Sequence, residues 1–238
     1  MPSPTTNPPA SWPPIAREGW PIVAGFLIVT AGVWTASWWA LGWPGHTAGA
    51  AMLALSLWAV WFFRDPDRSI PSERGAVICP ADGVVCFVGP GEPPPELGVD
   101  PAEARGMTRV SVFMNVFNVH VNRSPVGGVV ERVAYKPGRF FNASFDKASE
   151  LNERCSLLVR TPEGVAVPVV QIAGLIARRI VCRAREGDAL DAGARYGLIR
   201  FGSRVDTYLP RGVGASVRVG ARVTAGETVL ARLAGGES

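Results

Sequence analysis

Three polar residues on separate loops could together carry out nucleophilic chemistry. Asp82 lies in the stretch Pro-Ala-Asp-Gly, His120 is the second of only two histidines, and Ser203 follows Gly202 in the stretch IRFGSRV. A serine hydroxyl is a weak nucleophile until a neighbouring imidazole accepts its proton, and a carboxylate can orient that imidazole. Taken singly, however, Asp-Gly and Gly-Ser are common turn dipeptides, and a lone histidine is more often structural. The surrounding motifs therefore have to decide between a turn and a site.

The composition argues against several other kinds of site. The four cysteines form no CxxC pair and the chain has only two histidines, so we predict reduced thiols and no metal centre. The net charge of +4 comes with no block of Lys or Arg, so nucleic acid is not an expected partner. Lipoate and biotin are attached to lysine, and no lysine follows Lys147, which argues against a carrier domain.

The N-terminal quarter of the chain predicts a membrane hairpin. After a Pro-rich tail (residues 1–20), no Asp, Glu, Lys or Arg occurs between Glu18 and Arg64. This stretch is about twice as long as the ~20 residues that one membrane span needs, and the glycines and proline at 42–45 divide it. We therefore predict two membrane-spanning helices within residues 21–63. One span followed by an interfacial segment is the alternative.

The charges that flank the apolar stretch predict its orientation. Arg17 precedes it, and Arg64 and Arg68 follow it. Because positive flanks stay on the cytoplasmic side, the chain ends and the soluble part are expected on the cytoplasmic face of the cell membrane. A cleaved signal peptide fits poorly, since the apolar region is too long and begins after the Pro-rich tail.

After Phe63 the pattern changes to short β-type runs separated by Gly and Pro. The runs expected to form strands are 76–79, 83–88, 109–116, 126–135, 156–160, 165–173, 177–184, 197–201, 216–218 and 228–232. Frequent turns at a spacing of roughly ten residues are typical of a β-sandwich or barrel. The stretches 89–106 and 141–154 are predicted as exposed loops, the second with a short helix at its end. The soluble domain, 64–238, is thus expected to be mainly β, of hybrid-barrel or sandwich-like α+β type.

Six short motifs follow one another in an order typical of one enzyme family. They are FFRDP, PADGVV, FNVHVNRSPVGG, YKPGRF, GLIARRIVC and YGLIRFGSRVD. Each motif alone is weak evidence, but six in order over about three quarters of the chain are highly specific. In these motifs the sequence resembles the short bacterial (type A) phosphatidylserine decarboxylases, which depend on a pyruvoyl group.

The resemblance implies a zymogen that cleaves itself and then acts as a lyase in phospholipid biosynthesis. Ser203 would attack the carbonyl carbon of Gly202, with Asp82 and His120 activating the hydroxyl. The remnant of Ser203 would become a pyruvoyl group, the only cofactor, with no metal. This group would form a Schiff base with the amine of phosphatidylserine and accept the electrons left when carbon dioxide departs, giving phosphatidylethanolamine.

The same resemblance implies the partners of the chain. Cleavage between residues 202 and 203 would give a β chain (1–202) and an α chain (203–238) that form a heterodimer. The substrate would be a membrane phospholipid. A higher homo-oligomer stays open, and so does an ether-lipid (archaetidyl) serine as the substrate.

One position departs from the family pattern. Longer bacterial members resemble Y-H-x-V-H in the frame that ends at His120, and here Phe117 replaces the earlier histidine. His120 could then serve twice, as the base in self-cleavage and as the acid in decarboxylation. Arg123 and Arg204 are candidates for contacting the lipid phosphate or the serine carboxylate, since a guanidinium suits such oxyanions. A solvated surface arginine is the alternative for each.

Two functions from other classes stay open on the residues alone. A membrane-anchored hybrid-barrel adaptor without catalysis would explain the apolar segments, but it leaves the ordered motifs unexplained. A serine hydrolase would use the same three residues, but the stretch IRFGSRV is not the GxSxG motif of a nucleophile elbow. Either of these would keep the chain whole, whereas the decarboxylase would be found in two pieces.

Overall fold

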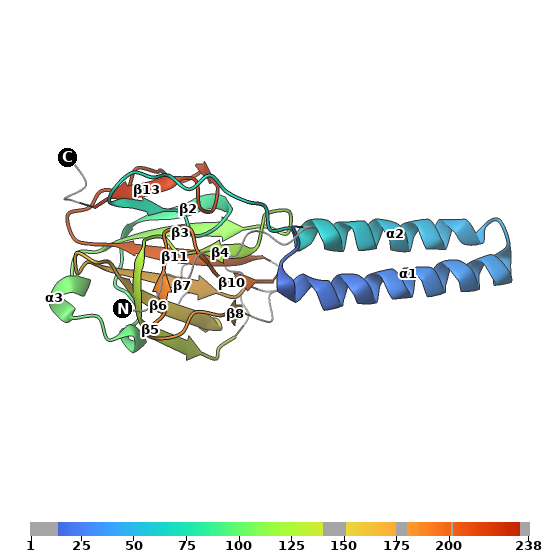
Figure 1. Ribbon diagram of the computed structural model, residues 1–238, viewed down its shortest axis with the longest axis horizontal. Helices are drawn as coiled ribbons and strands as arrows, with labels where there is room; N and C mark the ends of the chain where they lie inside the picture. Colours follow the sequence, from blue (N-terminus) through green and yellow to red (C-terminus); the bar gives the residue numbers. More distant parts are fainter. Residues whose placement is uncertain (1–13, 140–150, 175–179, 201, 234–238) are drawn as a thin grey trace. The chain divides into compact units, whose positions relative to one another are not determined.

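The computed structural model describes residues 14–139, 151–174, 180–200 and 202–233. The chain forms two compact units (Figure 1). The helical unit ends at Asp67 and the β-rich unit begins at Arg68.

Two antiparallel helices make up most of the helical unit (Figure 1). The short turn η1 (Arg17–Gly19) leads into α1 (Trp20–Leu41), and α2 (Gly45–Phe62) returns beside it. Gly42 ends α1 with a φ of +59°, a conformation that residues with a Cβ rarely adopt. The predicted division of the apolar stretch at 42–45 is confirmed.

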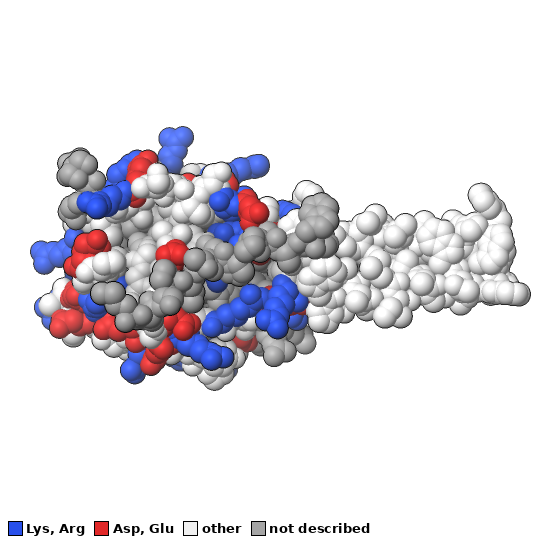
Figure 2. All heavy atoms as spheres, viewed as in Figure 1, with Lys and Arg blue, Asp and Glu red and all other residues white. Residues whose placement is uncertain are grey.

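The helices satisfy their few polar side chains against each other. The hydroxyls of Thr30 and Ser56 lie 2.8 Å apart, and the indole nitrogen of Trp34 donates to Nδ1 of His46 at 3.0 Å. Polar groups paired in this way are compatible with an apolar surrounding. By length and composition both helices could cross a membrane. On the face that Figure 2 shows, charged side chains cover the β-rich unit and none lies along the two helices.

The β-rich unit is built from antiparallel strands. Those in the described residues are β1 (Ala76–Ile78), β2 (Gly83–Pro90), β3 (Thr108–Met114), β4 (Val121–Arg123), β5 (Gly128–Lys136), β6 (Arg154–Arg160), β7 (Ala166–Ile172), β8 (Ile180–Cys182), β9 (Ala189–Leu190), β10 (Arg195–Ile199), β11 (Ser203–Leu209), β12 (Arg222–Val223) and β13 (Val229–Arg232). The long sheet has the order β12-β2-β3-β11-β7-β6-β5-β9, and β4-β10-β8 and β1-β13 form smaller sheets.

The main core lies on the inner face of the curled long sheet. Its residues include Val112, Leu157, Val169 and Val205 from the long sheet, with Ile199 from the three-stranded sheet packed against them. Side chains of a strand alternate between its two faces. The predicted mainly β domain of sandwich or barrel type is confirmed.

The outer face of the long sheet is covered by the segment that links β2 to β3. This segment contains η2 (Pro95–Leu97) and α3 (Pro101–Ala104). Leu97 is buried with Leu158 in one cluster, and Met107, just before β3, is buried with Tyr208 in another. The prediction of an exposed loop over 89–106 was therefore wrong in part, because the apolar residues of the segment pack on the sheet.

Other strand predictions had mixed outcomes. Most of the predicted runs contain a strand, but 216–218 does not, and β4, β9, β11 and β12 were missed. The predicted loop at 141–154 lies mostly outside the described residues, and its last residue, Arg154, begins β6. The most consequential miss is β11, since it begins at Ser203.

Candidate active site

Ser203 is the first residue of β11 and directly follows Gly202. Its side chain is fully buried, and its Oγ has no hydrogen-bond partner among the described residues. Gly202 has a φ of +59°, and a Cβ there would meet nothing within 4 Å, so backbone conformation rather than space favours glycine. Among the described residues the buried hydroxyls of Ser111, Ser156 and Thr207 also lack a partner, so the preceding glycine at positive φ is what distinguishes Ser203.

The register of the sheet places the loop of Asp82 near Ser203. Ser203 pairs with Met114 of β3, and on the other side of β3 the second residue of β2, Val84, pairs with Phe113. Neighbouring strands are about 4.8 Å apart, so this loop lies two strand spacings, roughly 10 Å, from Ser203. Gly83 directly follows Asp82, and any Cβ at position 83 would collide with the backbone carbonyl of Phe113.

His120 lies beside the segment that leads to the Gly202–Ser203 bond. Its side chain is buried, and its backbone carbonyl accepts a hydrogen bond from the amide of Ile199 at 3.2 Å. β4 begins at the next residue and pairs with β10, which ends at Ile199. The histidine is therefore held next to the strand that ends four residues before Ser203.

The carboxylate of Asp82 has two hydrogen-bonding partners. Nη2 of Arg68 lies 2.8 Å from Oδ2 and 3.1 Å from Oδ1, and the amide of Ala225 donates to Oδ1 at 2.8 Å. These contacts fix the direction of the carboxylate. Burial raises the pKa of the nearby Cys79 thiol to about 12, so the thiol stays neutral beside this carboxylate at physiological pH.

The turn that carries Asp82 is also attached to β4. The amide of Arg123 donates to the carbonyl of Pro80 at 3.0 Å. The residues before Asp82 therefore contact the strand that begins directly after His120. In this way the structure brings the three predicted residues, Asp82, His120 and Ser203, to the same end of the β-rich unit.

Arg123 belongs to the same polar cluster. Its side chain is buried, and its Nη1 donates to the carbonyl of Gly193 at 3.1 Å. The side chains of Arg123 and Arg68 both pack against Gly226: the Cδ of Arg123 and the Cβ of Arg68 lie close to where a Cβ at position 226 would be. Two guanidinium side chains thus approach the Asp82 turn. Within the described residues, no three His, Cys, Asp or Glu side chains form a group that could hold a metal ion.

Arg204 occupies a different position from the other candidates. It lies on the face of β11 opposite to Ser203, is 2% exposed, and forms a forked ion pair with Asp206. Its Nε lies 2.8 Å from Oδ1 and its Nη2 lies 3.0 Å from Oδ2. The surface alternative considered for this arginine is therefore wrong, because the guanidinium is inside the protein.

We expect the substitution Arg204→Met to lower the free energy of unfolding by about 3–5 kcal/mol, because it leaves the carboxylate of Asp206 buried without its ion-pair partner. Urea unfolding of the full chain in detergent would measure the loss. The double variant Arg204→Met/Asp206→Leu should recover most of it, since it removes both charges. Equal stability of the single and double variants would contradict a structural role for the pair.

Sequence reasoning missed two features of the site. One is Arg68, the partner of Asp82, which follows the FFRDP motif. The other is a buried amide pair, in which Nε2 of Gln171 donates to Oδ1 of Asn122 at 2.8 Å. Asn122 also lies 3.7 Å from the sulfur of Met114, the residue that pairs with Ser203. A lone glutamine in the apolar run AVPVVQIAG was the available signal.

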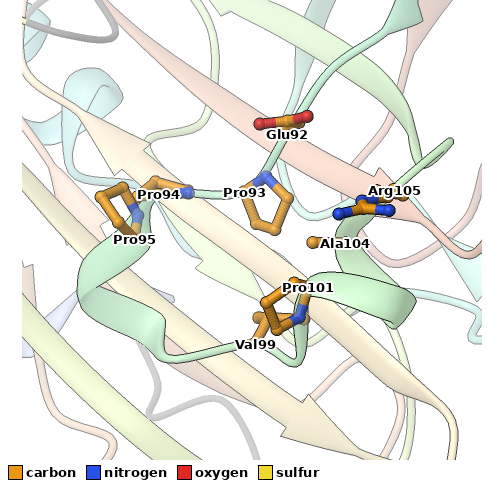
Figure 3. A pocket seen from close by; sticks show the side chains of 8 residues that line it. All are labelled: Glu92, Pro93, Pro94, Pro95, Val99, Pro101, Ala104 and Arg105. Atoms are coloured by element: carbon orange, nitrogen blue, oxygen red, sulfur yellow. The ribbon is translucent and has the colours of Figure 1, made fainter.

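A hollow of about 370 Å³ lies away from these residues. Figure 3 shows that prolines of the β2–β3 segment line it, together with Glu92, Val99, Ala104 and Arg105. It adjoins the start of β3, and Thr108 there pairs with Leu209 at the far end of β11. Six residues at about 3.3 Å each separate Leu209 from Ser203, roughly 20 Å, so the hollow is not part of the candidate site.

Known proteins resemble this chain over the whole of the site. The family model described as phosphatidylserine decarboxylase matches residues 55–231, which include Asp82, His120 and Ser203. A protein of Cereibacter sphaeroides named phosphatidylserine decarboxylase proenzyme is 51% identical over 225 residues. The aligned region covers 94% of this chain and 92% of that relative.

Proposed function

The chain belongs to the phosphatidylserine decarboxylase family, and on that premise we propose that it converts phosphatidylserine to phosphatidylethanolamine after cutting its own backbone between Gly202 and Ser203. Family membership makes the chain an enzyme, a carboxy-lyase that acts on a phospholipid. The name proenzyme, carried by the relative, fits a chain that is processed before it acts.

Self-cleavage begins with Ser203. Its Oγ attacks the carbonyl carbon of Gly202, a C–O bond forms, the C–N bond breaks, and the amide becomes an ester. His120 accepts the proton of the hydroxyl and returns a proton to the departing nitrogen. Loss of the Cα proton of Ser203 then expels the carboxylate of Gly202 and leaves dehydroalanine. Addition of one water and release of ammonia convert dehydroalanine to the pyruvoyl group.

The residues present fit the formation of a pyruvoyl group at position 203. The hydroxyl that must react is buried and makes no competing hydrogen bond within the described residues, and the preceding glycine already has a positive φ. When formed, the group supplies an electron sink for the carbanion that loss of carbon dioxide leaves behind. The pairing of Ser203 with Met114 holds the new chain end in place, and the amides of Asn122 and Gln171 line its surroundings.

The cluster around Asp82 supplies charge and orientation. We assign Asp82 the role of orienting the base. The attachment of its turn to Arg123, three residues after His120, supports this role, and Arg68 and Ala225 hold the carboxylate in place. Arg123 is the better candidate for a substrate anion, because Arg204 faces away from Ser203 and is paired with Asp206. His120 is the group that we assign to the protonation step after decarboxylation, since Phe117 has no proton to donate.

The helical unit is proposed to anchor the enzyme in the cell membrane, with residues 1–20 as a tail, 21–63 as the hairpin and 64–238 as the enzymatic domain on the cytoplasmic face. The apolar length of α1 and α2 supports an anchor. The guanidinium of Arg64 lies 4.1 Å from the ring centre of Trp61, a pairing suited to the lipid–water interface.

The observation that carries this function is the buried hydroxyl of Ser203 after a glycine at positive φ, in a chain of this family. Denaturing electrophoresis with intact-mass analysis of the purified protein should find two chains, residues 1–202 and 203–238. The 36-residue chain should have a blocked N-terminus that reacts with a ketone reagent such as phenylhydrazine. One intact chain that still decarboxylates phosphatidylserine would refute the proposal.

A further inference from the structure

Ser203 lies at one end of the long sheet. Paired residues form a single row across five strands there: Lys136, Arg154, Ile172, Arg204 and Phe113. Ser203 is one residue beyond this row. β5 ends at the row and β3 ends one residue beyond it, at Met114, on either side of β11 (Figure 1). We call the segments at the ends of β3 and β5, residues 115–119 and 135–139, together with Leu151, the reaction rim.

The loop after β3 exposes an aromatic side chain to solvent. The amide of Phe117 donates to Oδ1 of Asn115 at 2.8 Å, and the amide of Asn115 donates to Oδ1 of Asn118 at 2.9 Å. Side-chain to backbone bonds of this kind fix a turn. The ring of Phe117 is nevertheless 65% exposed. A fixed turn that presents a large apolar group suits a surface that becomes covered.

The other side of the rim also exposes apolar groups. Tyr135 is 60% exposed and Leu151 is 47% exposed. β5 is four strands from β3, which corresponds to roughly 19 Å at the usual strand spacing. Ser203 lies between the two sides. Apolar groups therefore flank the reactive residue across a distance comparable to a few lipid headgroups.

The rim is also basic. Lys136 and Arg139 are exposed. The positive charge of Lys136 interacts with the carboxylate of Glu96. That carboxylate already accepts hydrogen bonds from Nε and Nη2 of Arg154 at 2.6 and 2.8 Å. Within the described residues Lys136 forms no ion pair of its own, although its charge acts on Glu96. Exposed basic and aromatic residues together are typical of a surface that lies at a membrane interface.

The opposite end of the sheet has a different character. There Arg160 pairs with Glu131 at 2.7 Å and with Glu103 at 3.2 Å, so its charge is balanced by two carboxylates. Four of the eight residues that line the hollow at this end are prolines. The far end also exposes Arg105 and Arg211, so charge alone does not select one end. The reaction rim differs in exposing the large side chains of Phe117, Tyr135 and Leu151 beside its basic residues.

We propose that the reaction rim docks on the lipid surface of the membrane. Phe117, Tyr135 and Leu151 enter the interfacial layer, and Lys136 and Arg139 bind anionic headgroups. This inference rests on the proposed function, because docking brings the reactive end of the sheet to the layer that holds phosphatidylserine. The hairpin retains the protein in the membrane, so docking orients the enzymatic domain rather than recruiting it.

The test compares substrate in a bilayer with substrate in solution, using the full chain. The bilayer probe is vesicles of phosphatidylserine in phosphatidylcholine, and the soluble probe is short-chain phosphatidylserine below its micelle concentration. Phe117→Ser should lower the ratio of vesicle activity to soluble-substrate activity about tenfold, as expected for removing one large apolar contact. The double variant Lys136→Glu/Arg139→Glu should lower the same ratio by a similar factor. High salt should reduce the effect of this charge variant but not that of Phe117→Ser.

Matched substitutions at the far end serve as controls. Val129→Ser removes a 46%-exposed apolar side chain there, and Arg105→Glu reverses an exposed charge. Both should keep the ratio of the parent. An unchanged ratio in the rim variants, or an equal fall in the controls, would overturn the docking. An equal loss of activity on vesicles and on the soluble substrate in the Phe117 variant would assign Phe117 to the reaction itself. That result would also overturn the docking.

A second measurement does not depend on catalysis. Amide hydrogen exchange of the full chain should be several-fold slower at residues 115–119 and 135–139 in nanodiscs that contain phosphatidylserine than in detergent micelles. Exchange at residues 127–131 should not change. Equal exchange at the rim in both settings would refute docking even if the chain proved to be neither cleaved nor active, and slower exchange would support docking independently of the proposed function.

Discussion

Replacing Ser203 with alanine should leave one chain of 25.3 kDa and abolish decarboxylation. Alanine has no hydroxyl to attack the carbonyl of Gly202, so neither the ester nor the pyruvoyl group can form. Because the ordinary side chains offer no comparable electron sink, activity should fall by at least a factor of about 10⁴. Intact-mass analysis and an assay of phosphatidylethanolamine formation would measure the two effects.

Thr207 provides a matched control for this prediction. It lies on the same face of β11 as Ser203, is equally buried, and its Oγ1 likewise has no hydrogen-bond partner among the described residues. Thr207→Ala therefore removes a comparable hydroxyl without touching the scissile bond, and it should be cleaved normally. If Ser203→Ala were still cut between residues 202 and 203, the assignment of the nucleophile would be wrong.

Replacing His120 with alanine should slow self-cleavage by a factor of about 10² to 10⁴, the usual contribution of a general base. The uncleaved chain would accumulate, and chain synthesis followed by a time course of denaturing electrophoresis would give the rate. The fraction that matures slowly should also turn over lipid slowly, because the same imidazole is assigned to the later protonation step. The two effects are separable when activity is expressed per cleaved chain.

His46 and Asp82 offer the comparisons for this second prediction. His46→Ala removes the only other imidazole, which hydrogen bonds to Trp34 within the hairpin, and it should leave the cleavage rate unchanged. Asp82→Asn should slow cleavage in the same direction as His120→Ala but by less, since it only weakens the orientation of the base. Normal processing of the histidine variant would remove His120 from the mechanism.

The sequence predicted the helical hairpin and the β class because both depend on local patterns. An uncharged stretch of this length has few alternatives to apolar helices, and Gly42 with its neighbours marks the turn. Runs of alternating apolar residues likewise predicted most strands of the long sheet. The three candidate positions, Asp82, His120 and Ser203, were proposed from short motifs, which can be read without knowing which distant residues they meet in the fold.

The sequence could not predict the strand that begins at Ser203. β11 reads SRVDTYL, and charged residues at alternate positions suggest an exposed strand or a loop. Only the three-dimensional structure reveals that Arg204 and Asp206 neutralise each other beneath the β2–β3 segment. The pairing of Arg68 with Asp82 was equally hidden, since no local rule connects the arginine that begins the β-rich unit to a turn 14 residues later in the same unit.

The place of β11 between β3 and β7 has a consequence for how the two chains would hold together after the proposed cleavage. Cleavage just before β11 would break none of its pairings with β3 or β7. The 203–238 chain would also contribute β12, which pairs with β2, and β13, which pairs with β1. The two polypeptides should then move as one particle until the sheet itself melts. If the two fragments were synthesised separately, the larger one would expose β3 and β7 as unpaired edge strands in the middle of the sheet. Unpaired edges promote aggregation, so folding as one continuous precursor avoids this exposure.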